Sequence, residues 1–335
     1  MVGVLKKSST KWIGLGITFI AFIVCIGLSI IMGYAHIDWH TVIDAYTHYN
    51  QSNAEAIVRE ARVPRALIAA TVGASLSISG ALMQALARNP LASPDILGVN
   101  AGASLFIVIA ITFFSATSIN ALAPLAFLGA ALASIIVYLL GSLGPERLSP
   151  VKLTLAGAAM AAFFTSMTQG ILTSNEQTLD AVLFWLVGSV QGRDLSLLTG
   201  VLPYFCLGWI ASLLIGSKMN TLVLGDNVAK GVGQNPLLVK AVTGIIIILL
   251  AGGSVAVAGP IGFIGIVIPH IAKWFVGQDY RWLIPYSALL GGILLLVADI
   301  AARYVIMPEE VPVGVMTAIV GTPFFIFIAK KGAWR

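Results

Sequence analysis

The sequence predicts an all-α, polytopic membrane protein of about ten transmembrane helices, forming one domain over residues 1–335. Three observations predict this fold class: 58% of the residues are hydrophobic, only 10% are charged, and the mean hydropathy is +0.96. A soluble domain has roughly 25% charged residues, and a water-soluble fold of this composition would expose large apolar patches. The composition therefore favours repeated crossing of a bilayer.

Long apolar runs recur along the whole chain. A helix that rises about 1.5 Å per residue needs roughly 20 apolar residues to cross a hydrocarbon core about 30 Å thick. The runs are continuous, whereas the strands of a membrane β-barrel alternate over about ten residues. They predict ten spans, at residues 13–34, 62–86, 95–114, 121–142, 152–173, 195–216, 238–258, 263–276, 284–305 and 312–329.

The first span follows three lysines, Lys6, Lys7 and Lys11, and so resembles a secretory signal. A cleavable signal has a shorter apolar region of about 7–15 residues that ends in a small-residue cleavage site. We therefore expect the span to be retained, with residues 1–12 as a cytoplasmic tail.

The basic residues predict an orientation, because lysine and arginine accumulate in short cytoplasmic loops. With the amino terminus inside, all ten lysines and four of the nine arginines lie inside, 14 in total. Both termini are then cytoplasmic. The five exceptions on the outside are Arg59, Arg62, Arg65, Arg193 and Arg303.

Three of these outer arginines, Arg59, Arg62 and Arg65, lie together at the start of the second span. Snorkelling of a long side chain to the interface explains any one of them. The cluster of three suggests a basic docking patch for an acidic partner surface. Asp299 is the one acid deep in an apolar span, and its i, i+4 spacing to Arg303 predicts an ion pair near the outer interface.

The sequence has no phosphate loop for ATP, since the dipeptide Gly-Lys is absent from it. Nor do the spans contain runs of carboxylates and histidines suited to a proton relay, which argues against an autonomous ion-coupled transporter without excluding one. A membrane-embedded enzyme would need a metal or nucleophile cluster, and none is evident. We expect no metal and no cofactor on this chain, because the acids and histidines after the first span fit a solvated loop: His36, Asp38, His40, Asp44 and His48.

The longest polar stretch on the predicted inner side runs over residues 216–236. Asp226 can support a helix amino end, and Gly225, Gly231 and Gly233 divide the stretch into short pieces. Two short helices at the membrane surface would suit docking into a partner groove. An ordinary interfacial loop explains the stretch equally well.

Glycine and proline interrupt the apolar runs at residues 89–94, 259–265 and 268–270. Such breaks are tolerated where the freed backbone groups are buried in protein or line a cavity, so they often mark a transport path. Close helix packing is the commoner reason for glycine in membrane helices.

Several motifs resemble those of the FecCD-type permeases, the membrane subunits of iron-siderophore, haem and cobalamin ABC importers. In the first half they are Arg62-Val63-Pro64-Arg65, Gly80-Ala81-Leu82-Met83-Gln84, Asn89-Pro90-Leu91-Ala92 and Leu97-Gly98-Val99. In the second half they are Gly262-Phe263-Ile264-Gly265, Pro269-His270, Ala298-Asp299-Ile300-Ala301-Ala302-Arg303 and Pro312-Val313-Gly314-Val315.

The resemblance implies the type II permease fold of ABC importers and a transport subunit rather than an enzyme. It also implies a homo- or heterodimer of permeases in the bacterial cytoplasmic membrane, two ATP-binding subunits that hold ATP and Mg²⁺, an extracytoplasmic substrate-binding protein, and no nucleic acid. Similar permeases dock the binding protein through arginines that match Arg62, Arg65 and Arg303, with Arg59 beside them. Their ATPase coupling loop is similar to Leu224, Gly225, Asp226, Ala229 and Gly233.

The cargo that the resemblance favours is an iron(III)-siderophore complex, with haem and cobalamin as alternatives. A gate resembles Ser149, Pro150 and Val151, although the cobalamin permease has a small polar pair where Pro150 and Val151 stand here. Met160, Phe164 and Thr168 share one helical face by their i, i+4, i+8 spacing. They are candidates for the translocation pathway, and helix packing is the alternative.

Overall fold

The computed structural model describes residues 3–35, 37–50, 52–114, 119–143, 150–175, 182, 185–307 and 309–332. Over these residues the chain is helical, apart from turns, loops and an isolated β-bridge between Ile306 and Glu309. Among the predicted functional residues, Ser149 lies outside the described part, as does His36 of the polar loop.

Ten helical stretches of the described chain match the ten predicted spans. Seven are long and apolar enough to cross a membrane: α1 (Ser8–Ile31), the stretch Asn53–Leu86, α6 (Ile119–Ser142), α7 (Pro150–Ser174), α9 (Leu195–Val223), the stretch Pro236–Ala258, and α14 (Tyr280–Ala302). Three are shorter apolar helices: α5 (Val99–Phe114), α13 (Ile264–Val276) and α15 (Val313–Gly332). The polytopic all-α prediction is confirmed.

Two of these stretches are composite. The first joins α3 (Asn53–Ala56), a π-helical segment η1 (Ile57–Arg62) and α4 (Val63–Leu86). The second joins α11 (Pro236–Ile247), a π-helical segment η3 (Ile248–Gly252) and α12 (Gly253–Ala258). Each π segment widens the helix locally without ending it.

The short elements lie between the long helices. They are α2 (Trp39–Thr47), a 3₁₀ turn η2 (Pro94–Leu97) and α10 (Asp226–Gly231). The side chain of Asp38 accepts a hydrogen bond from the Thr41 amide at 3.0 Å and so caps the amino end of α2. Ser52 and Glu55 form a capping box that starts α3.

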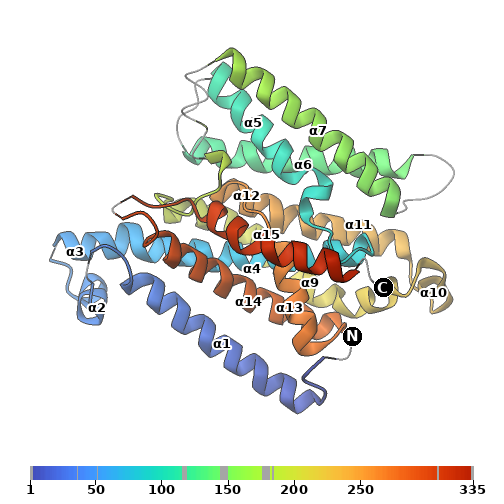
Figure 1. Ribbon diagram of the computed structural model, residues 1–335, viewed down its shortest axis with the longest axis horizontal. Coiled ribbons are helices and arrows are strands. Elements are labelled where there is room, and N and C mark those ends of the chain that lie inside the picture. Colours follow the sequence, from blue (N-terminus) through green and yellow to red (C-terminus); the bar gives the residue numbers. More distant parts are fainter. Residues whose placement is uncertain are drawn as a thin grey trace.

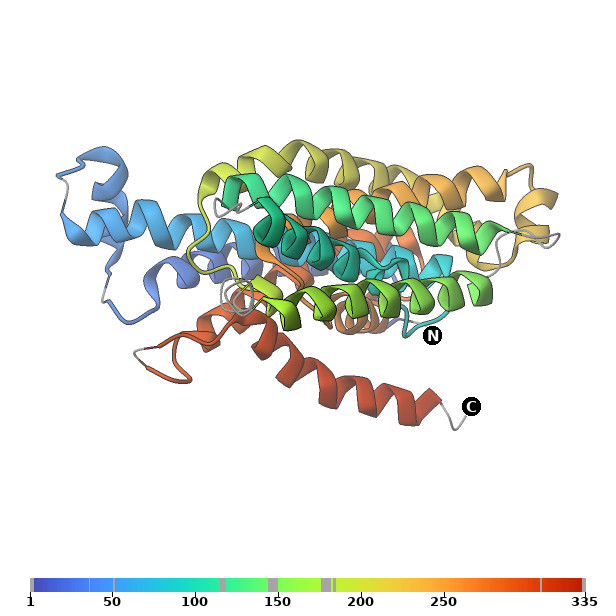
Figure 2. The same ribbon diagram turned by 90° about the horizontal axis from the view of Figure 1, so that it is seen from above.

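The long helices run side by side along one axis of the molecule (Figures 1 and 2). α10, the start of α1 and the end of α15 lie at one end, and α2 and α3 lie at the other (Figure 1). Both chain ends therefore share a side, as an even number of crossings requires. We call the two sides the Arg88 end and the Arg65 end, after residues at opposite ends of α4.

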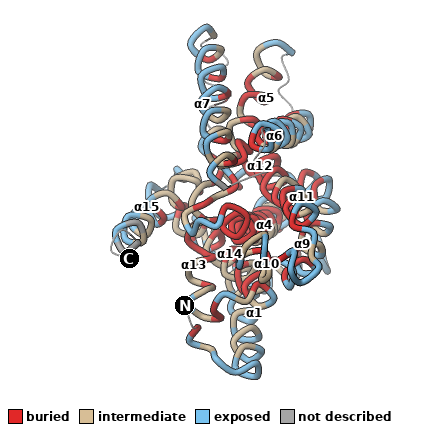
Figure 3. Tube along the Cα trace, turned by 90° about the vertical axis from the view of Figure 1, so that its right-hand side faces the viewer, coloured by how far each residue is buried: buried red, intermediate tan, exposed pale blue. Residues whose placement is uncertain are grey.

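α4 is the centre of the bundle. Of the 18-residue window in its stretch, 83% is buried, and Figure 3 shows α4 surrounded by the other helices. α14 packs against it through glycines, since a Cβ at Gly73 would lie 2.3 Å from the Gly291 carbonyl oxygen. α5, α6 and α7 stand on one side of this core and α1 on the opposite side (Figures 1 and 3). Close backbone contact of this kind is the usual basis of helix association in membranes.

Two of the three predicted glycine and proline breaks, at residues 89–94 and 259–265, are observed as non-helical turns inside the bundle. After α4, the chain leaves the helix at Arg88 and passes the buried residues Ala92 and Pro94 before α5 begins. After α12, Gly259 and Phe263 both have positive φ, 72° and 69°. The third predicted break, at residues 268–270, is not observed, because α13 continues through Pro269.

The polar stretch 216–236 differs from its prediction. α9 continues to Val223, so the first third of the stretch is the end of a long helix. α10 is the one separate short helix here, and α11 already begins at Pro236. The expectation of two short surface helices is therefore wrong, because Ser217, Lys218 and Asn220 extend α9 past its apolar part instead of ending it.

Candidate functional site: two charged networks and a polar pocket

A group of charged side chains is buried at the Arg65 end of the bundle, and we call it the arginine network: Arg62, Arg65, Asp299, Arg303 and Glu310. At its centre Asp299 is fully buried, and Arg65 from α4 binds it in a fork, with Nε–Oδ1 at 2.9 Å and Nη2–Oδ1 at 2.8 Å. Arg303, one turn further along α14, reaches Oδ2 at 2.5 Å. Two charge-assisted contacts thus neutralise one carboxylate that has no access to water.

The arginines have further partners in the chain. Arg303 donates to the carbonyls of Ser29 and Met32, each at 2.6 Å, at the end of α1. Arg65 also pairs with Glu310 at 2.5 Å. Arg62 donates to the carbonyls of Met32 and Ala35. The network thereby fastens the ends of α1, α4 and α14 to one another.

Burial separates the four arginines that the sequence assigns to docking. Arg62, Arg65 and Arg303 are only 8%, 9% and 3% exposed, whereas Arg59 is exposed. The Arg59 guanidinium lies 4.5 Å from the ring centroid of Tyr49 and 5.6 Å from that of Tyr46. The predicted Asp299–Arg303 pair is confirmed. A continuous exposed patch of arginines is not observed.

No local pattern in the sequence indicates that Arg65 and Glu310 complete this network, since Arg65 is separated from its two acids by 234 and 245 residues. The one local signal is Asp299, an isolated acid in an apolar span with Arg303 one helical turn away. It indicates a buried charge that needs a cation beside it, but it does not indicate that Arg65 is the second cation.

A second network lies at the Arg88 end, centred on Asp226 at the start of α10. Arg88, just after α4, reaches Asp226 Oδ1 at 2.5 Å, and Lys240 of α11 reaches Oδ2 at 2.7 Å. Burial works against the ionised form of Asp226, but the hydrogen bond and charge of Lys240, with those of Arg88, hold the pKa of this carboxyl below its ordinary value. Asp226 therefore stays charged near neutral pH and ties α10 to two long helices.

Three exposed apolar side chains lie on α10 and directly beside it, and we call them the α10 ridge. Val228 is in the helix, Leu224 lies just before it and Val232 just after it, and they are 46%, 70% and 68% exposed, whereas Ala229 of the helix is fully buried. Gly225 and Gly233 flank the helix with φ of 125° and 79°, a conformation that glycine adopts without strain. An exposed apolar surface on a short helix and its flanks is suited to a hydrophobic groove of a partner.

The third feature is a polar pocket of about 330 Å³ between η2, α5 and α7. Its polar lining consists of Asp95, Asn100, Ser104, Thr165, Thr168 and Gln169. Gly157 makes room for the turn, since a Cβ there would lie 1.7 Å from the Ile96 carbonyl oxygen. A carboxylate, two amides and three hydroxyls within an apolar bundle form a site for a polar solute.

The three predicted pathway residues of α7 do not share one environment. Thr168 lines the polar pocket, although its hydroxyl donates to the Phe164 carbonyl at 2.9 Å. Phe164 is 8% exposed and packs with Leu105 of α5, and Met160 packs against the same cluster. Packing thus accounts for Met160 and Phe164 within this chain. Polar side chains of α7 that face outward are Thr165, Ser166, Gln169 and Thr173.

The predicted gate is described only in part. Pro150 is the first residue of α7, and Val151 beside it is 67% exposed. Ser149 lies outside the described residues.

Apolar helices in ten stretches of the described chain, with two charged networks at opposite ends and a polar pocket within the bundle, define a polytopic membrane protein. The sequence matches the FecCD transport family over residues 21–331. The chain belongs to this family.

Two relatives and one solved structure support the assignment. The chain is 54% identical over 328 residues to the "Probable siderophore transport system permease protein YfiZ" of Bacillus subtilis, covering 98% of each chain. It is 40% identical over 309 residues to the ferric enterobactin transport system permease protein FepD of Escherichia coli, covering 92% of each. It superposes with a TM-score of 0.82 and 26% identity on an inward-facing conformation of a metal-chelate type ABC transporter, covering 95% of this chain and 98% of that one.

Proposed function

We propose that this chain is the permease subunit through which an ABC importer carries iron(III)-siderophore complexes across the bacterial cytoplasmic membrane, driven by ATP hydrolysis on partner subunits. The observation that supports the cargo is the 54% identity to a siderophore permease over 98% of both chains. Relatives of lower identity can differ in cargo class, but similarity at this level over the full length of both chains favours the same cargo class.

The ridge of α10 is the surface we assign to the ATP-binding subunits. Leu224 and Val232 are exposed apolar side chains at the edge of a bundle, and such residues bury their surface in a partner groove. Asp226 transmits a force on α10 to Arg88 at the end of α4 and to Lys240 of α11. ATP and Mg²⁺ are then held by the ATP-binding subunits. Movement of the groove of such a subunit shifts α10, and with it α4 and α11.

This assignment places the Arg88 end in the cytoplasm and the Arg65 end outside. Both chain termini are then cytoplasmic, in agreement with the 14 of 19 basic residues that the charge rule puts inside.

The surface we assign to the substrate-binding protein lies at the Arg65 end. The loop after Arg303 exposes Tyr304, Val305, Ile306 and Met307, by 43–57% each. Arg303 and Glu310 flank this loop and are both held by the arginine network. The buried arginines therefore position an apolar docking loop, and Arg59 supplies an exposed positive charge nearby for an acidic partner residue.

The outward polar face of α7 is the part of this chain that we assign to the translocation pathway. A polar face that looks out of a membrane helix is unfavourable against lipid, so a second permease subunit facing it across a water-filled path removes that cost. Thr165 and Gln169 on this face also line the polar pocket with Asp95. Cargo that passes between two subunits would meet these groups.

The test is complementation of a bacterial strain in which this gene is deleted. Radioactive iron is supplied as a hydroxamate, a catecholate or a citrate chelate, and in parallel as haem, with labelled cobalamin as a separate cargo. Wild-type protein should restore uptake of at least one siderophore and of neither haem nor cobalamin. Restored uptake of haem or cobalamin alone would refute the siderophore cargo. Uptake driven by an ion gradient in vesicles that contain no ATPase would refute the ABC mechanism.

A further inference from the structure

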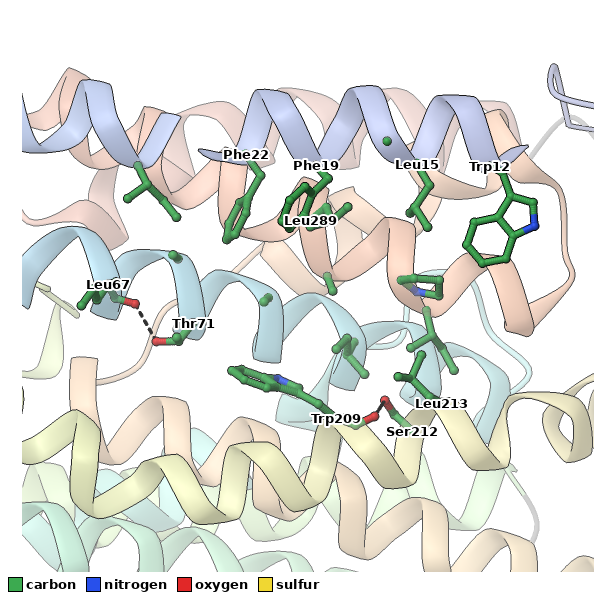
Figure 4. Close-up of a pocket in the computed structure, with 18 residues that line it drawn as sticks. Trp12, Leu15, Phe19, Phe22, Leu67, Thr71, Trp209, Ser212, Leu213 and Leu289 are labelled. Atoms are coloured by element: carbon green, nitrogen blue, oxygen red, sulfur yellow. Dashed lines mark hydrogen bonds between the residues drawn. The ribbon is translucent and has the colours of Figure 1, made fainter. Parts of the chain in front are cut away.

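A large apolar groove opens between α1 and α9, with α4 and α14 as its floor (Figure 4). Its volume is about 840 Å³, within the range of about 300–1,000 Å³ that small-molecule sites occupy. Phe19 and Phe22 from α1, Leu67 from α4, Leu213 from α9 and Leu289 from α14 line it. α1 depends on few protein contacts here, because only 6% of its 18-residue window is buried.

The polar side chains deep in the groove are already bonded within the protein. Thr71 donates to the Leu67 carbonyl at 2.8 Å and Ser212 donates to the Trp209 carbonyl at 2.7 Å, as the dashed lines in Figure 4 show. The indole nitrogen of Trp209 donates to Ser75 Oγ at 3.0 Å. Among the described residues, the donors of these deep side chains are therefore all used within the protein, and hydrocarbon fits this part of the lining best.

The mouth of the groove has a different chemistry. Trp12 lies there and meets Trp282 edge to face, with 5.0 Å between the ring centroids, and Lys11 Nζ is 5.8 Å from the Trp282 centroid. Lys6 and Lys7 precede α1 at the same end. Within the described part of the chain, none of these three lysines has a carboxylate partner. Tryptophan and lysine together are typical of the headgroup level of a membrane.

The groove is long enough to hold much of an acyl chain. Along α1 it runs from Trp12 to Ile26, which is 14 residues or about 21 Å, so it extends from the headgroup level past the middle of a hydrocarbon core about 30 Å thick. We propose that the groove binds an acyl chain of an anionic phospholipid from the cytoplasmic leaflet, whose headgroup lies at Lys7 and Lys11. The choice of leaflet rests on the orientation proposed above.

A lipid fits this site better than a second permease copy does. α7, whose outward polar face we assign to the subunit interface, lies on the opposite side of the bundle from α1 (Figures 1 and 3). Unpaired lysines at an intramembrane groove are the usual recognition elements for acidic lipid headgroups. The bound acyl chain would supply α1 with apolar contacts that the rest of the protein does not provide.

Native mass spectrometry of the purified full-length chain tests this site with dioleoylphosphatidylglycerol and, as the uncharged match, dioleoylphosphatidylcholine. Gly16 lines the groove and a Cβ there meets nothing within 4 Å, so Gly16→Trp fills the groove without a backbone clash. Gly200→Trp is the control, because Gly200 is also open and lies on α9 outside the groove. Lys7→Gln/Lys11→Gln removes charge and leaves the groove intact.

We expect the wild-type chain and Gly200→Trp to retain the phosphatidylglycerol, and Gly16→Trp to lose it by about tenfold or more. The double lysine variant should lower the preference for phosphatidylglycerol over phosphatidylcholine by about fivefold per lysine. A phosphatidylglycerol with a photoreactive acyl chain should label residues 12–26 of the wild-type chain, which tests the site even if Gly16→Trp fails to fold.

Equal lipid retention by Gly16→Trp and Gly200→Trp would overturn the proposal, as would an unchanged headgroup preference in the lysine variant. A Gly16→Trp protein that loses its dimer but keeps its lipid would show that a second copy occupies the groove. Because the assay uses neither cargo nor ATP, failure of siderophore uptake with intact lipid binding would refute the proposed transport function and leave this site standing.

Discussion

Replacing Asp299 with alanine should destabilise the protein more than any other single change in the arginine network. Asp299 is fully buried and compensates Arg65 and Arg303, which are 9% and 3% exposed. Removing it leaves Arg65 with Glu310 as its acid partner, and leaves Arg303 with no acid partner among the described residues. Breaking a buried ion pair by removing one partner costs about 3–5 kcal/mol, and the loss of a shared partner places this variant at the upper part of that range.

The measurement is thermal unfolding of the purified chain in mild detergent, followed by helix content. Glu310→Gln is the matched control, because the Glu310 side chain is 23% exposed and Arg65 keeps Asp299 when Glu310 is neutralised. It should cost about 1 kcal/mol or less. Replacing the three central charges together, Asp299→Leu with Arg65→Met and Arg303→Met, should recover much of the lost stability, since a well-packed apolar core can replace a buried charge cluster.

A result that contradicts this reasoning is Asp299→Ala with a stability within about 1 kcal/mol of the wild type, or no less stable than Glu310→Gln. Either would show that water reaches the network and that its arginines are solvated. The same result would restore Arg65 and Arg303 as direct contacts for the binding protein.

Four further predictions concern the proposed surfaces. Leu224→Asp should leave the fold intact, because Leu224 is 70% exposed, yet lose cargo-stimulated ATPase activity of the assembled complex; normal coupling would contradict the role of α10. Arg59→Glu should weaken binding-protein affinity by about fivefold or more in a pull-down titration, without changing the unfolding temperature. Asp95→Asn should lower uptake while expression stays normal, because it removes the charge of the polar pocket; equal uptake would assign the pocket to packing. Because the pKa of Asp226 is lowered in the folded state, its contribution to stability is present above the unfolded pKa of about 3.9 and is lost as the pH falls through the lower folded pKa. The hydrogen-exchange protection factors of α10, which are corrected for the intrinsic rise of amide exchange with pH, should therefore not change between about pH 5 and 8.

The spans were predictable because each depends on a local property. The apolar runs placed the carboxyl ends of nine of the ten spans within three residues of the observed helix ends, since a segment must be apolar along its own length to lie in lipid. The end of α9 was missed: Ser217, Lys218 and Asn220 are polar, and polarity ends a membrane run although the helix itself continues to Val223.

Site residues were predictable only where partners are close in sequence. Asp299 and Arg303 lie one helical turn apart, and their pair could be read from spacing. Asp226 was expected to start a helix, and it does, but its contacts with Arg88 and Lys240 join three elements and have no local signature. Met160 and Phe164 pack together with Leu105, as the packing alternative for this helical face expects, and their place on a translocation pathway stays a prediction. Spacing defines which residues share a side of a helix and not what that side packs against.

The sequence by itself determined that this chain crosses a membrane many times, which orientation in the membrane its charges favour, and which family its motifs resemble. These properties follow from hydropathy, charge counts and short motifs, all of which are local. Only the tertiary structure decided that three of the four arginines predicted to dock a partner are buried, two of them paired with Asp299, and that the exposed surface there is an apolar loop with Arg59. Burial and long-range pairing depend on which helices meet, and packing of the whole bundle fixes that.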